Sequence, residues 1–468
     1  MQTYGSILQQ DESHCPNQTP GADCGDKSSS PAPEFKVRQF GTKAILTVND
    51  ENSIWAKYDY SKQQKRETEG VSYATNASNR VNGLAVKQSV SAGHDLKLED
   101  FILNTYIQDT STKNPTRGNG IDYYVLTANT QGTYFFESNA LTAGIQYRNE
   151  KLDDRATNAM PGNPPIIMKR YSYALFAEDE WNIIDDLSLT SGLRLNEDEN
   201  FGTHINPRLY VVYSGFGDFT FKGGVASAYK APTLRQAADD FGGVSGGGMP
   251  GNTVMMMGNP DVKPETSLSY EISAGYANKN MGIDASVTAY HTDFKDKITS
   301  VTICETPTGL PMDCNYKGEM YRRLTTYDNV DKATIEGVEI ALNYDILSNF
   351  ALGYTYTYTK TEQKTGANAG KPLNNIPRHM LNANIDYKPT SKLSLWGQYN
   401  YKSKYPETNP SIKNKGYYFI DLGAAYKLKD DLKITAGIYN VLNKEITFDT
   451  HGRYIEGRRI SLGFVADF

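Results

Sequence analysis

Seven side chains in the polar stretches of this sequence could bind an anionic ligand. They are Arg80, Arg117, Arg235, Lys317, Tyr321, Arg322 and Arg323. Guanidinium and ammonium groups donate charge-assisted hydrogen bonds to anions, and aromatic rings add stacking and charge attraction. We therefore predict that these side chains form a site for an anion. The Tyr321, Arg322 and Arg323 cluster is its strongest part, because it joins one ring to two cations. The alternative for each residue is an ordinary solvated charge on a loop.

Catalytic chemistry is not indicated by any group of residues. The segment Gly366–Lys371 superficially resembles a phosphate-binding loop, but its glycines are one position too close, and Pro372 replaces the hydroxyl residue. The six histidines are dispersed along the chain. We therefore predict no enzymatic activity and no resident cofactor. The run Met255–Met257 could hold a soft metal such as copper, or it could pack a flexible loop.

The composition of the 468 residues excludes two classes of protein. Lysine and arginine total 48, scattered along a chain of formal net charge −6, so no nucleic-acid partner is expected. Mean hydropathy is −0.56, and no window of about 18 residues is continuously apolar, which excludes a helical membrane protein. The 33 tyrosines, against 17 phenylalanines, supply amphipathic rings that suit a boundary between lipid and water.

The four cysteines form two local pairs, Cys15 with Cys24 and Cys304 with Cys314, each inside a polar stretch. This arrangement predicts two disulfides that clip loops in an oxidising compartment. His14 beside Cys15 leaves metal binding as an alternative, but neither pair has the two-residue spacing of a zinc site. The chain begins without a basic region and an apolar core. Either a signal peptide was removed or the natural N-terminus is absent.

The elements that would position these residues alternate polar and apolar side chains with a period of two. In the segment 268–276 the apolar residues are Leu268, Tyr270, Ile272, Ala274 and Tyr276. The same alternation recurs at 283–287, 381–387, 418–428 and 432–438. The longest of these segments, 268–276 and 418–428, have about ten residues, the length that a tilted strand needs to cross a bilayer. Strands of soluble sandwiches are shorter, at about 5 to 6 residues.

The connections alternate between short turns and long polar segments. Short turns are predicted at 49–52, 182–186, 277–280, 346–349, 389–392 and 429–431. Long polar segments are predicted at about 10–39, 62–82, 109–121, 151–169, 230–266, 303–332, 362–377, 406–416 and 444–456. Short turns on one rim and long loops on the other are typical of bacterial outer-membrane barrels. The sequence therefore predicts an all-β, transmembrane, antiparallel up-and-down β-barrel of about 20 strands.

The end of the chain supports the same fold. Counting back from Phe468, every second residue is apolar, namely Ala466, Phe464, Leu462 and Ile460. A chain that ends on an aromatic residue in an alternating strand resembles the assembly signature of outer-membrane barrels. A soluble protein with such an exposed apolar face would aggregate.

Six ordered motifs resemble those of TonB-dependent receptors, the plugged barrels that import iron chelates across the outer membrane of Gram-negative bacteria. They lie at 228–236 (AYKAPTLRQ), 258–266 (GNPDVKPET), 329–339 (NVDKATIEGVE), 375–379 (NIPRH), 439–444 (YNVLNK) and 457–459 (GRR). The resemblance spans about residue 40 to the end. Within the family, the loop 231–265 is most similar to the branch of catecholate siderophore and colicin receptors.

The resemblance implies a receptor that imports ferric catecholates such as ferric enterobactin with energy from TonB. Such receptors have a barrel of about 22 strands, an N-terminal plug and a segment that TonB pulls. Residues 1–468 are expected to be the barrel domain alone, beginning about two strands into the barrel, as a fragment or the product of a late start codon. Other implied partners are outer-membrane lipid, colicins and phages, and the barrel is expected to be monomeric. By position, Arg117 resembles the arginine that such receptors place under the ligand.

Three alternatives remain. Haem receptors carry similar paired motifs but ligate iron through a histidine between them, and residues 233–258 contain no histidine. A barrel without its plug could be a passive, porin-like pore, which liposome conductance would detect. A structural or adhesive surface barrel would not bind ferric enterobactin.

Overall fold

The structure is a computed structural model of the chain. It describes residues 1–10, 34–66, 81–115, 120–155, 157–158, 160, 166–245, 253–307, 310–366, 369–373, 376–405, 414–444, 446, 451, 455 and 457–466. No helix among these residues is long and apolar enough to cross a membrane.

Twenty strands of eight residues or more make up the wall within the described residues. They are β1 (Gln2–Gln10), β2 (Glu34–Thr47), β3 (Asn52–Arg66), β4 (Val81–Lys97), β5 (Phe101–Asn114), β6 (Ile121–Phe135), β7 (Asn139–Asp154), β8 (Ile166–Ile184), β9 (Leu187–Asp198), β10 (Gly202–Phe216), β11 (Phe219–Lys230), β14 (Glu265–Asn278), β15 (Ile283–Glu305), β18 (Arg323–Leu347), β19 (Phe350–Gln363), β20 (His379–Tyr387), β21 (Leu393–Lys402), β22 (Tyr417–Lys429), β23 (Leu432–Tyr439) and β24 (Arg459–Ala466). Four further strands have only three or four residues, namely β12 (Gly242–Ser245), β13 (Val254–Met257), β16 (Cys314–Tyr316) and β17 (Glu319–Tyr321). The prediction of about 20 strands is confirmed.

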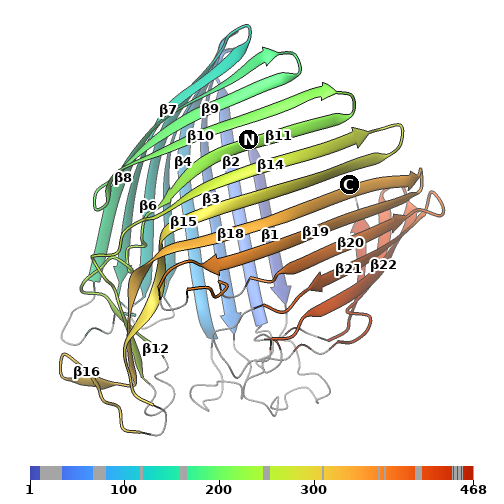
Figure 1. The fold of residues 1–468 in the computed structure, drawn as a ribbon. Coiled ribbons are helices and arrows are strands. Elements are labelled where there is room, and N and C mark those ends of the chain that lie inside the picture. Colours follow the sequence, from blue (N-terminus) through green and yellow to red (C-terminus); the bar gives the residue numbers. More distant parts are fainter. Residues whose placement is uncertain are drawn as a thin grey trace.

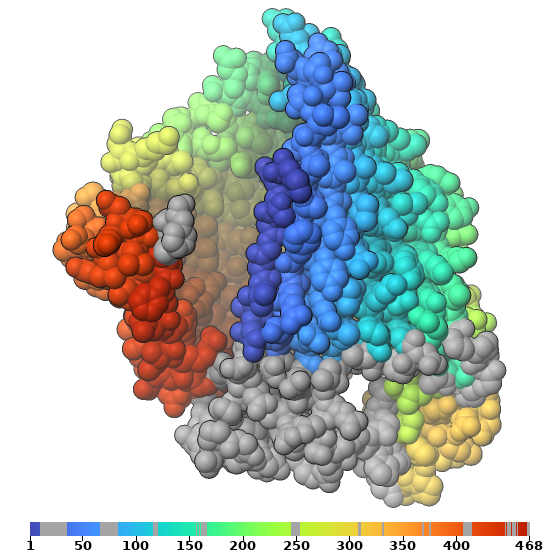
Figure 2. Space-filling model, turned by 180° about the vertical axis from the view of Figure 1, so that it is seen from behind, coloured from blue at the N-terminus to red at the C-terminus, as the bar shows by residue number. Residues whose placement is uncertain are grey.

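The long strands pair with their neighbours in chain order, and every pairing between them is antiparallel. The sheet curves round into the barrel wall seen in Figure 1. Among the described residues β1 pairs only with β2, and β24 pairs only with β23. Figure 2 shows β1 and the C-terminal strands on the two sides of a gap in the wall.

The connections divide between two rims as predicted. Tight turns join β2 to β3, β14 to β15, β18 to β19, β20 to β21 and β22 to β23 at the predicted places. The turns between β4 and β5, β6 and β7, and β10 and β11 lie on the same rim and were not predicted. The short strands β12 and β16 extend from the opposite rim (Figure 1). The opposite rim is called the long-loop rim below.

Strands on the long-loop rim continue further than predicted. A loop was expected over 303–332, but β15 and β18 remain paired as far as Glu305 and Arg323. The strand pairing continues here although polar residues lie on both faces, so the apolar pattern does not mark the true ends of the strands. The hairpins therefore project beyond the predicted bilayer-spanning part of the wall.

The two faces of the wall differ in chemistry. On β14, Tyr270 and Ile272 belong to the apolar outer face and are 46% and 68% exposed. Next to Ile272, Ser273 points to the inner face, where its hydroxyl lies 2.9 Å from that of Thr288. Such hydroxyl pairs satisfy hydrogen bonds between neighbouring strands. The alternation in the sequence therefore corresponds to an apolar outside and a polar inside.

Gly337 on β18 shows why one wall position carries no side chain. A Cβ atom built there would lie 2.3 Å from the carbonyl oxygen of Tyr358 and 2.6 Å from the hydroxyl oxygen of Tyr290. The Tyr290 hydroxyl lies 3.2 Å from that of Thr359 across the inner face. Glycine therefore allows the Tyr290 ring to cross β18 towards β19.

Candidate functional site

The segment 231–236 follows the end of β11 at the long-loop rim. Pro232 has no amide hydrogen, so it ends the strand pairing where the chain leaves the sheet. Pro232 is fully buried, and its carbonyl oxygen accepts a hydrogen bond of 2.6 Å from Arg170 Nη1. Arg170 therefore ties this segment to strand β8.

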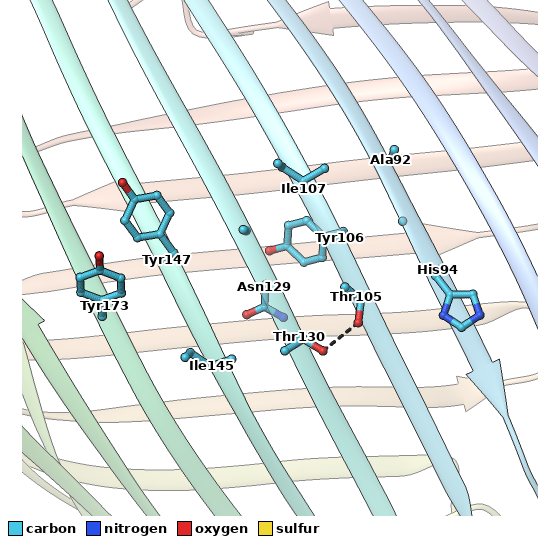
Figure 3. Close-up of a pocket in the computed structure, with 12 residues that line it drawn as sticks. Ala92, His94, Thr105, Tyr106, Ile107, Asn129, Thr130, Ile145, Tyr147 and Tyr173 are labelled. Carbon is cyan, nitrogen blue, oxygen red and sulfur yellow. Dashed lines mark hydrogen bonds between the residues drawn. The ribbon is translucent and has the colours of Figure 1, made fainter.

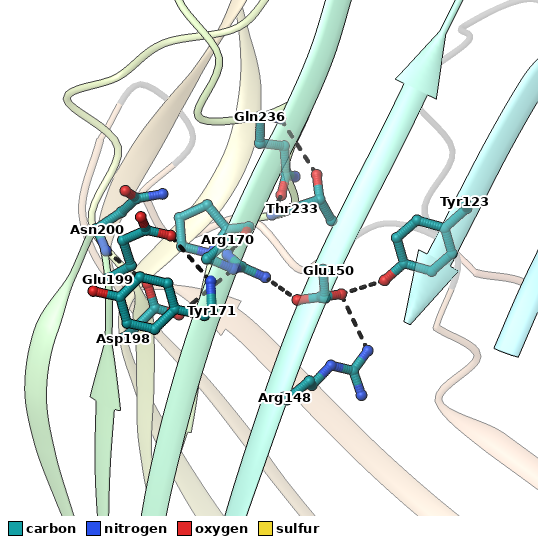
Figure 4. Close-up of polar contacts among 11 residues, drawn as sticks. Tyr123, Arg148, Glu150, Arg170, Tyr171, Asp198, Glu199, Asn200, Thr233 and Gln236 are labelled. Carbon is teal, nitrogen blue, oxygen red and sulfur yellow. Dashed lines mark hydrogen bonds and ion pairs between the residues drawn. The ribbon is translucent and has the colours of Figure 1, made fainter. Parts of the chain in front are cut away.

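Arg170 also belongs to a buried ion network, shown in Figure 4. Its Nη2 lies 2.8 Å from Oε2 of Glu150, and its Nε lies 3.5 Å from Oδ2 of Asp198. Glu150 also accepts hydrogen bonds from Arg148, at 3.1 Å, and from the Tyr123 hydroxyl. The side chains of Arg170 and Glu150 are only 10% and 12% exposed. The network joins β6, β7, β8 and β9 beneath the segment 231–236.

Arg235, one of the predicted binding residues, is held by a second buried carboxylate. Its Nε and Nη2 donate to Oδ2 of Asp154 at 2.9 and 2.5 Å. Asp154 is fully buried and also accepts from the amide and hydroxyl of Thr157. The guanidinium carbon lies 5.4 Å from the centroid of the Phe241 ring. These contacts anchor the segment, while about a third of the Arg235 side chain (35%) faces solvent.

The predicted disulfide between Cys304 and Cys314 is present. Cys15 and Cys24 lie outside the described residues. Cys314 belongs to a buried cluster with Tyr321, Leu324 and three methionines, Met160, Met255 and Met257. Tyr321 is 6% exposed, and burial raises the pKa of its hydroxyl. Its ring is therefore part of a packed cluster beside the disulfide.

The two arginines after Tyr321 point to different partners. Arg322 is buried and donates to the carbonyl oxygen of Pro307 at 2.6 Å. Arg323 forms an ion pair of 2.6 Å with Glu305. The structure therefore does not bring the ring and the two cations of this cluster together around one open site. Their part in ligand binding stays a prediction.

The other predicted residues lie apart. Lys317 lies in the tight turn between β16 and β17 with a positive φ of 50°, and its Nζ lies 5.6 Å from the centroid of the Tyr316 ring. Arg80 and Arg117 fall outside the described residues, so their predicted roles stay untested.

A cationic cavity that the sequence did not reveal lies at the long-loop ends of β19, β20 and β21. It measures about 760 Å³, and its lining includes Arg378, Lys404, Tyr401, Tyr405 and Thr359. Met380 pairs with Lys402, and the Ser403 amide donates to the His379 carbonyl at 2.9 Å, so Arg378 and Lys404 lie two residues beyond the Met380–Lys402 pair on the same two chain segments. Neither cation makes an ion pair within the described part of the chain. The cavity therefore offers two uncompensated positive charges beside aromatic rings and a hydroxyl.

Arg378 stands in the motif 375–379, which could have pointed to it. In the sequence this motif indicates the family, and Lys404 falls just before the predicted loop 406–416. In the sequence, neither Arg378 nor Lys404 stands out as a binding residue. Strand pairing between β20 and β21 makes the site, and sequence spacing does not show that pairing.

The described residues form no cluster of metal-binding side chains. Among the described residues no group of three or more His, Cys, Asp or Glu side chains could hold a metal ion. Met255 is fully buried and Met257 is 8% exposed, while the Met256 sulfur accepts a hydrogen bond of 3.0 Å from the Tyr327 hydroxyl. The methionine run therefore has a packing role in this structure.

An apolar hollow of about 550 Å³ lies on the wall between β4 and β8 (Figure 3). Its lining includes Ala92, Ile107, Ala128 and Tyr147, which are directly paired across β4 to β7. Ile107 is 51% exposed on the apolar outer face. The small alanine side chains create the hollow, and its position on the outer face separates it from the cationic cavity.

Comparison with known proteins gives one family for this chain. The family model "TonB dependent receptor-like, beta-barrel" matches residues 21–441. The chain is 33% identical to the iron-regulated outer membrane virulence protein of Vibrio cholerae serotype O1, covering 99% of the chain and 68% of that protein. It is 28% identical to the ferrienterobactin receptor of Escherichia coli K12, covering 67% of the chain and 44% of that protein.

A solved structure also matches the fold. It is a variant of the ferric enterobactin receptor from Pseudomonas aeruginosa in complex with enterobactin, with a TM-score of 0.82. The match covers 100% of this chain and 76% of that chain at 21% identity, so it bears on the fold alone.

Proposed function

Because the chain belongs to the TonB-dependent receptor β-barrel family of the Gram-negative outer membrane, we propose that its long-loop rim binds ferric catecholate siderophores. Members of this family are receptors and transporters. The iron regulation named for one relative and the enterobactin binding named for another support this class of ligand.

The observation that carries the proposal is the cationic cavity at Arg378 and Lys404. A ferric tris-catecholate is a trianion with flat aromatic edges, so its site needs cationic donors and aromatic faces together. Both cations lack a carboxylate partner among the described residues, while Tyr401 and Tyr405 supply rings. The volume of about 760 Å³ lies within the range of small-molecule sites. An anionic ligand would therefore replace water around charges that the protein does not neutralise.

The proposal assigns different roles to the other cationic residues. Arg235 and Arg322 hold the protein together through Asp154 and the carbonyl of Pro307. Arg80, Arg117 and Lys317 remain candidates for capturing the ligand from loops. Energised import through TonB, and entry by colicins or phages, would follow binding at this rim.

The test is a titration of the purified chain in detergent with ferric enterobactin, followed by quenching of tyrosine and tryptophan fluorescence. Arg378→Ala and Lys404→Ala should each weaken binding about 10- to 100-fold, because a hydrogen bond to a charged group contributes about 1.5–3 kcal/mol. Lys279→Ala, in the turn between β14 and β15 on the opposite rim, is the matched control and should bind like the wild type.

Two results would contradict the proposal. If micromolar ferric enterobactin does not quench the fluorescence of the wild-type protein, ferric catecholates are not its ligands. If both cavity variants bind ferric enterobactin as tightly as the wild type, the ligand binds elsewhere on the protein. A parallel titration with haemin tests the haem alternative, and tighter binding of haemin than of ferric enterobactin would favour it.

A further inference from the structure

The outer face of β15, β18 and β19 changes from apolar to cationic towards the long-loop rim. These neighbouring strands lie together in Figure 1. Their register places residues side by side in rows, and every second residue along a strand belongs to this face. From the middle of the wall outward, the rows are Val287, Ile340 and Tyr356; Ala289, Val338 and Tyr358; His291, Glu336 and Lys360; Asp293, Thr334 and Glu362; and Lys295, Lys332 and Lys364.

The third row neutralises its own charge. Glu336 lies 2.7 Å from Lys360 Nζ and 3.4 Å from Nδ1 of His291. An apolar surface followed by such a row marks where the wall passes from hydrocarbon to the headgroup region. Tyr358 in the row below fits this level, because tyrosine is enriched at membrane interfaces.

The lysine row is not neutralised in the same way. Lys295 is paired directly opposite Lys332, and the amide of Lys364 donates to the carbonyl of Lys332 at 2.8 Å. Like charges directly opposite each other on neighbouring strands destabilise a sheet. Lys364 has one ion pair, with Glu362 at 2.8 Å, whereas Lys295 and Lys332 have none within the described residues. The row therefore carries an uncompensated positive charge that an external anion would relieve.

The lysine row lies at the height of lipid headgroups. It is four residues beyond the His291 row, about 13 Å along the strand and about 10 Å along the membrane normal for a tilt of 35–45°. Lysine side chains extend back towards the interface to place their charges among headgroups. This rim carries the long loops, which face the outside of the cell in outer-membrane barrels. The partner at this height is therefore the outer leaflet.

A cavity adjoins the row. It measures about 580 Å³, and its lining includes the three lysines, one carboxylate residue, Asp293, and the outer-face residues Ile205 and Leu268. Ile205 is 59% exposed and Leu268 is 36% exposed. The same hollow therefore combines three ammonium groups with an apolar wall that continues into the lipid-facing surface.

We propose that Lys295, Lys332 and Lys364 form a binding site for the phosphate groups of a phosphorylated lipid in the outer leaflet. The ammonium groups bind the phosphates, and Ile205 and Leu268 contact the start of the acyl chains. This site lies on the outer wall, so it is independent of the cationic cavity at Arg378. It would hold a shell lipid against β15, β18 and β19.

The experiment uses the full chain in detergent and measures retention of diphosphoryl lipid A by native mass spectrometry. The test variant combines Lys295→Gln, Lys332→Gln and Lys364→Gln. The matched control combines Lys279→Gln, Lys388→Gln and Lys392→Gln, three exposed lysines at turns on the opposite rim. Each lysine near a lipid surface contributes about a fivefold gain in affinity, so the test variant should bind on the order of 100-fold more weakly. The control should bind like the wild type.

Two further arms separate the sources of phosphate and exclude misfolding. Dephosphorylated lipid A should lose most of its binding to the wild type, and inorganic phosphate at millimolar concentration should not displace diphosphoryl lipid A. Unchanged ferric enterobactin affinity in the test variant shows that its barrel is intact. Equal retention by the test variant and the wild type would overturn the site, and displacement by inorganic phosphate would identify an anion site without a lipid.

Discussion

Replacing Arg235 by alanine should loosen the segment after β11 without weakening ligand binding. In the folded protein Arg235 neutralises the fully buried carboxylate of Asp154 through two hydrogen bonds of 2.9 and 2.5 Å. The substitution removes this cation, while the hydrogen bonds from the Thr157 hydroxyl and amide remain. A buried charge that has lost its partner is costly.

The magnitude follows from the geometry. A hydrogen bond to a charged group contributes about 1.5–3 kcal/mol, and two bonds to one oxygen are not additive. The Arg235 side chain is 35% exposed, so water screens part of the interaction. We expect a loss of about 2 kcal/mol, which corresponds to an increase of about 30-fold in local opening.

Hydrogen exchange measured by mass spectrometry tests this value. The amides of Ala237 and Phe241, bonded to the carbonyls of Thr233 and Ala238, should exchange about 30-fold faster in Arg235→Ala. Asp154→Asn added to Arg235→Ala should restore part of the protection, because the buried negative charge is then gone. Unchanged exchange together with lost ferric enterobactin binding would refute the reasoning and make Arg235 a ligand contact.

Three further results are expected. Cys304→Ser with Cys314→Ser should speed exchange in the β16–β17 hairpin, because closing a loop of this length stabilises by about 3 kcal/mol; exchange equal to that of the oxidised wild type would contradict this. Burial raises the pKa of the Tyr321 hydroxyl above its ordinary 10.0, so the neutral hydroxyl contributes its full stabilisation below pH 10 and loses it as the pH rises further. Tyr321→Phe should remove this loss of stability at alkaline pH, as unfolding measured from pH 8 to 11 would show. Gly337→Val should lower the unfolding temperature because its Cβ would meet the Tyr358 carbonyl at 2.3 Å, whereas Gly275→Ala, with its nearest neighbour at 3.7 Å, should not; equal unfolding temperatures would show that β18 can shift.

The wall was predictable because lipid and water impose opposite chemistry on the two faces of every strand. Alternation at 268–276 was sufficient to predict β14. The turn between β6 and β7 was missed because Phe135 and Phe136 continue the apolar signal to the rim, where both are exposed. Beyond the bilayer the constraint disappears, so the outer ends of β15 and β18 were placed too early.

The site was less predictable because side chains that are adjacent in sequence need not share a direction. Tyr321 enters the buried cluster while Arg323 pairs with Glu305. Conversely, Arg378 and Lys404 are separated by 25 intervening residues and approach each other only because β20 pairs with β21. Cation type and loop position indicate the ligand class, but strand register decides which cations lack a partner.

The most direct measurement is the position of bound iron, located by anomalous X-ray diffraction from crystals of the chain grown with ferric enterobactin. We expect one iron peak inside the cavity between Arg378 and Lys404, with the catecholate rings near Tyr401 and Tyr405. An iron peak beside Tyr321 and Arg323, or no peak anywhere at the long-loop rim, would contradict the proposed binding site.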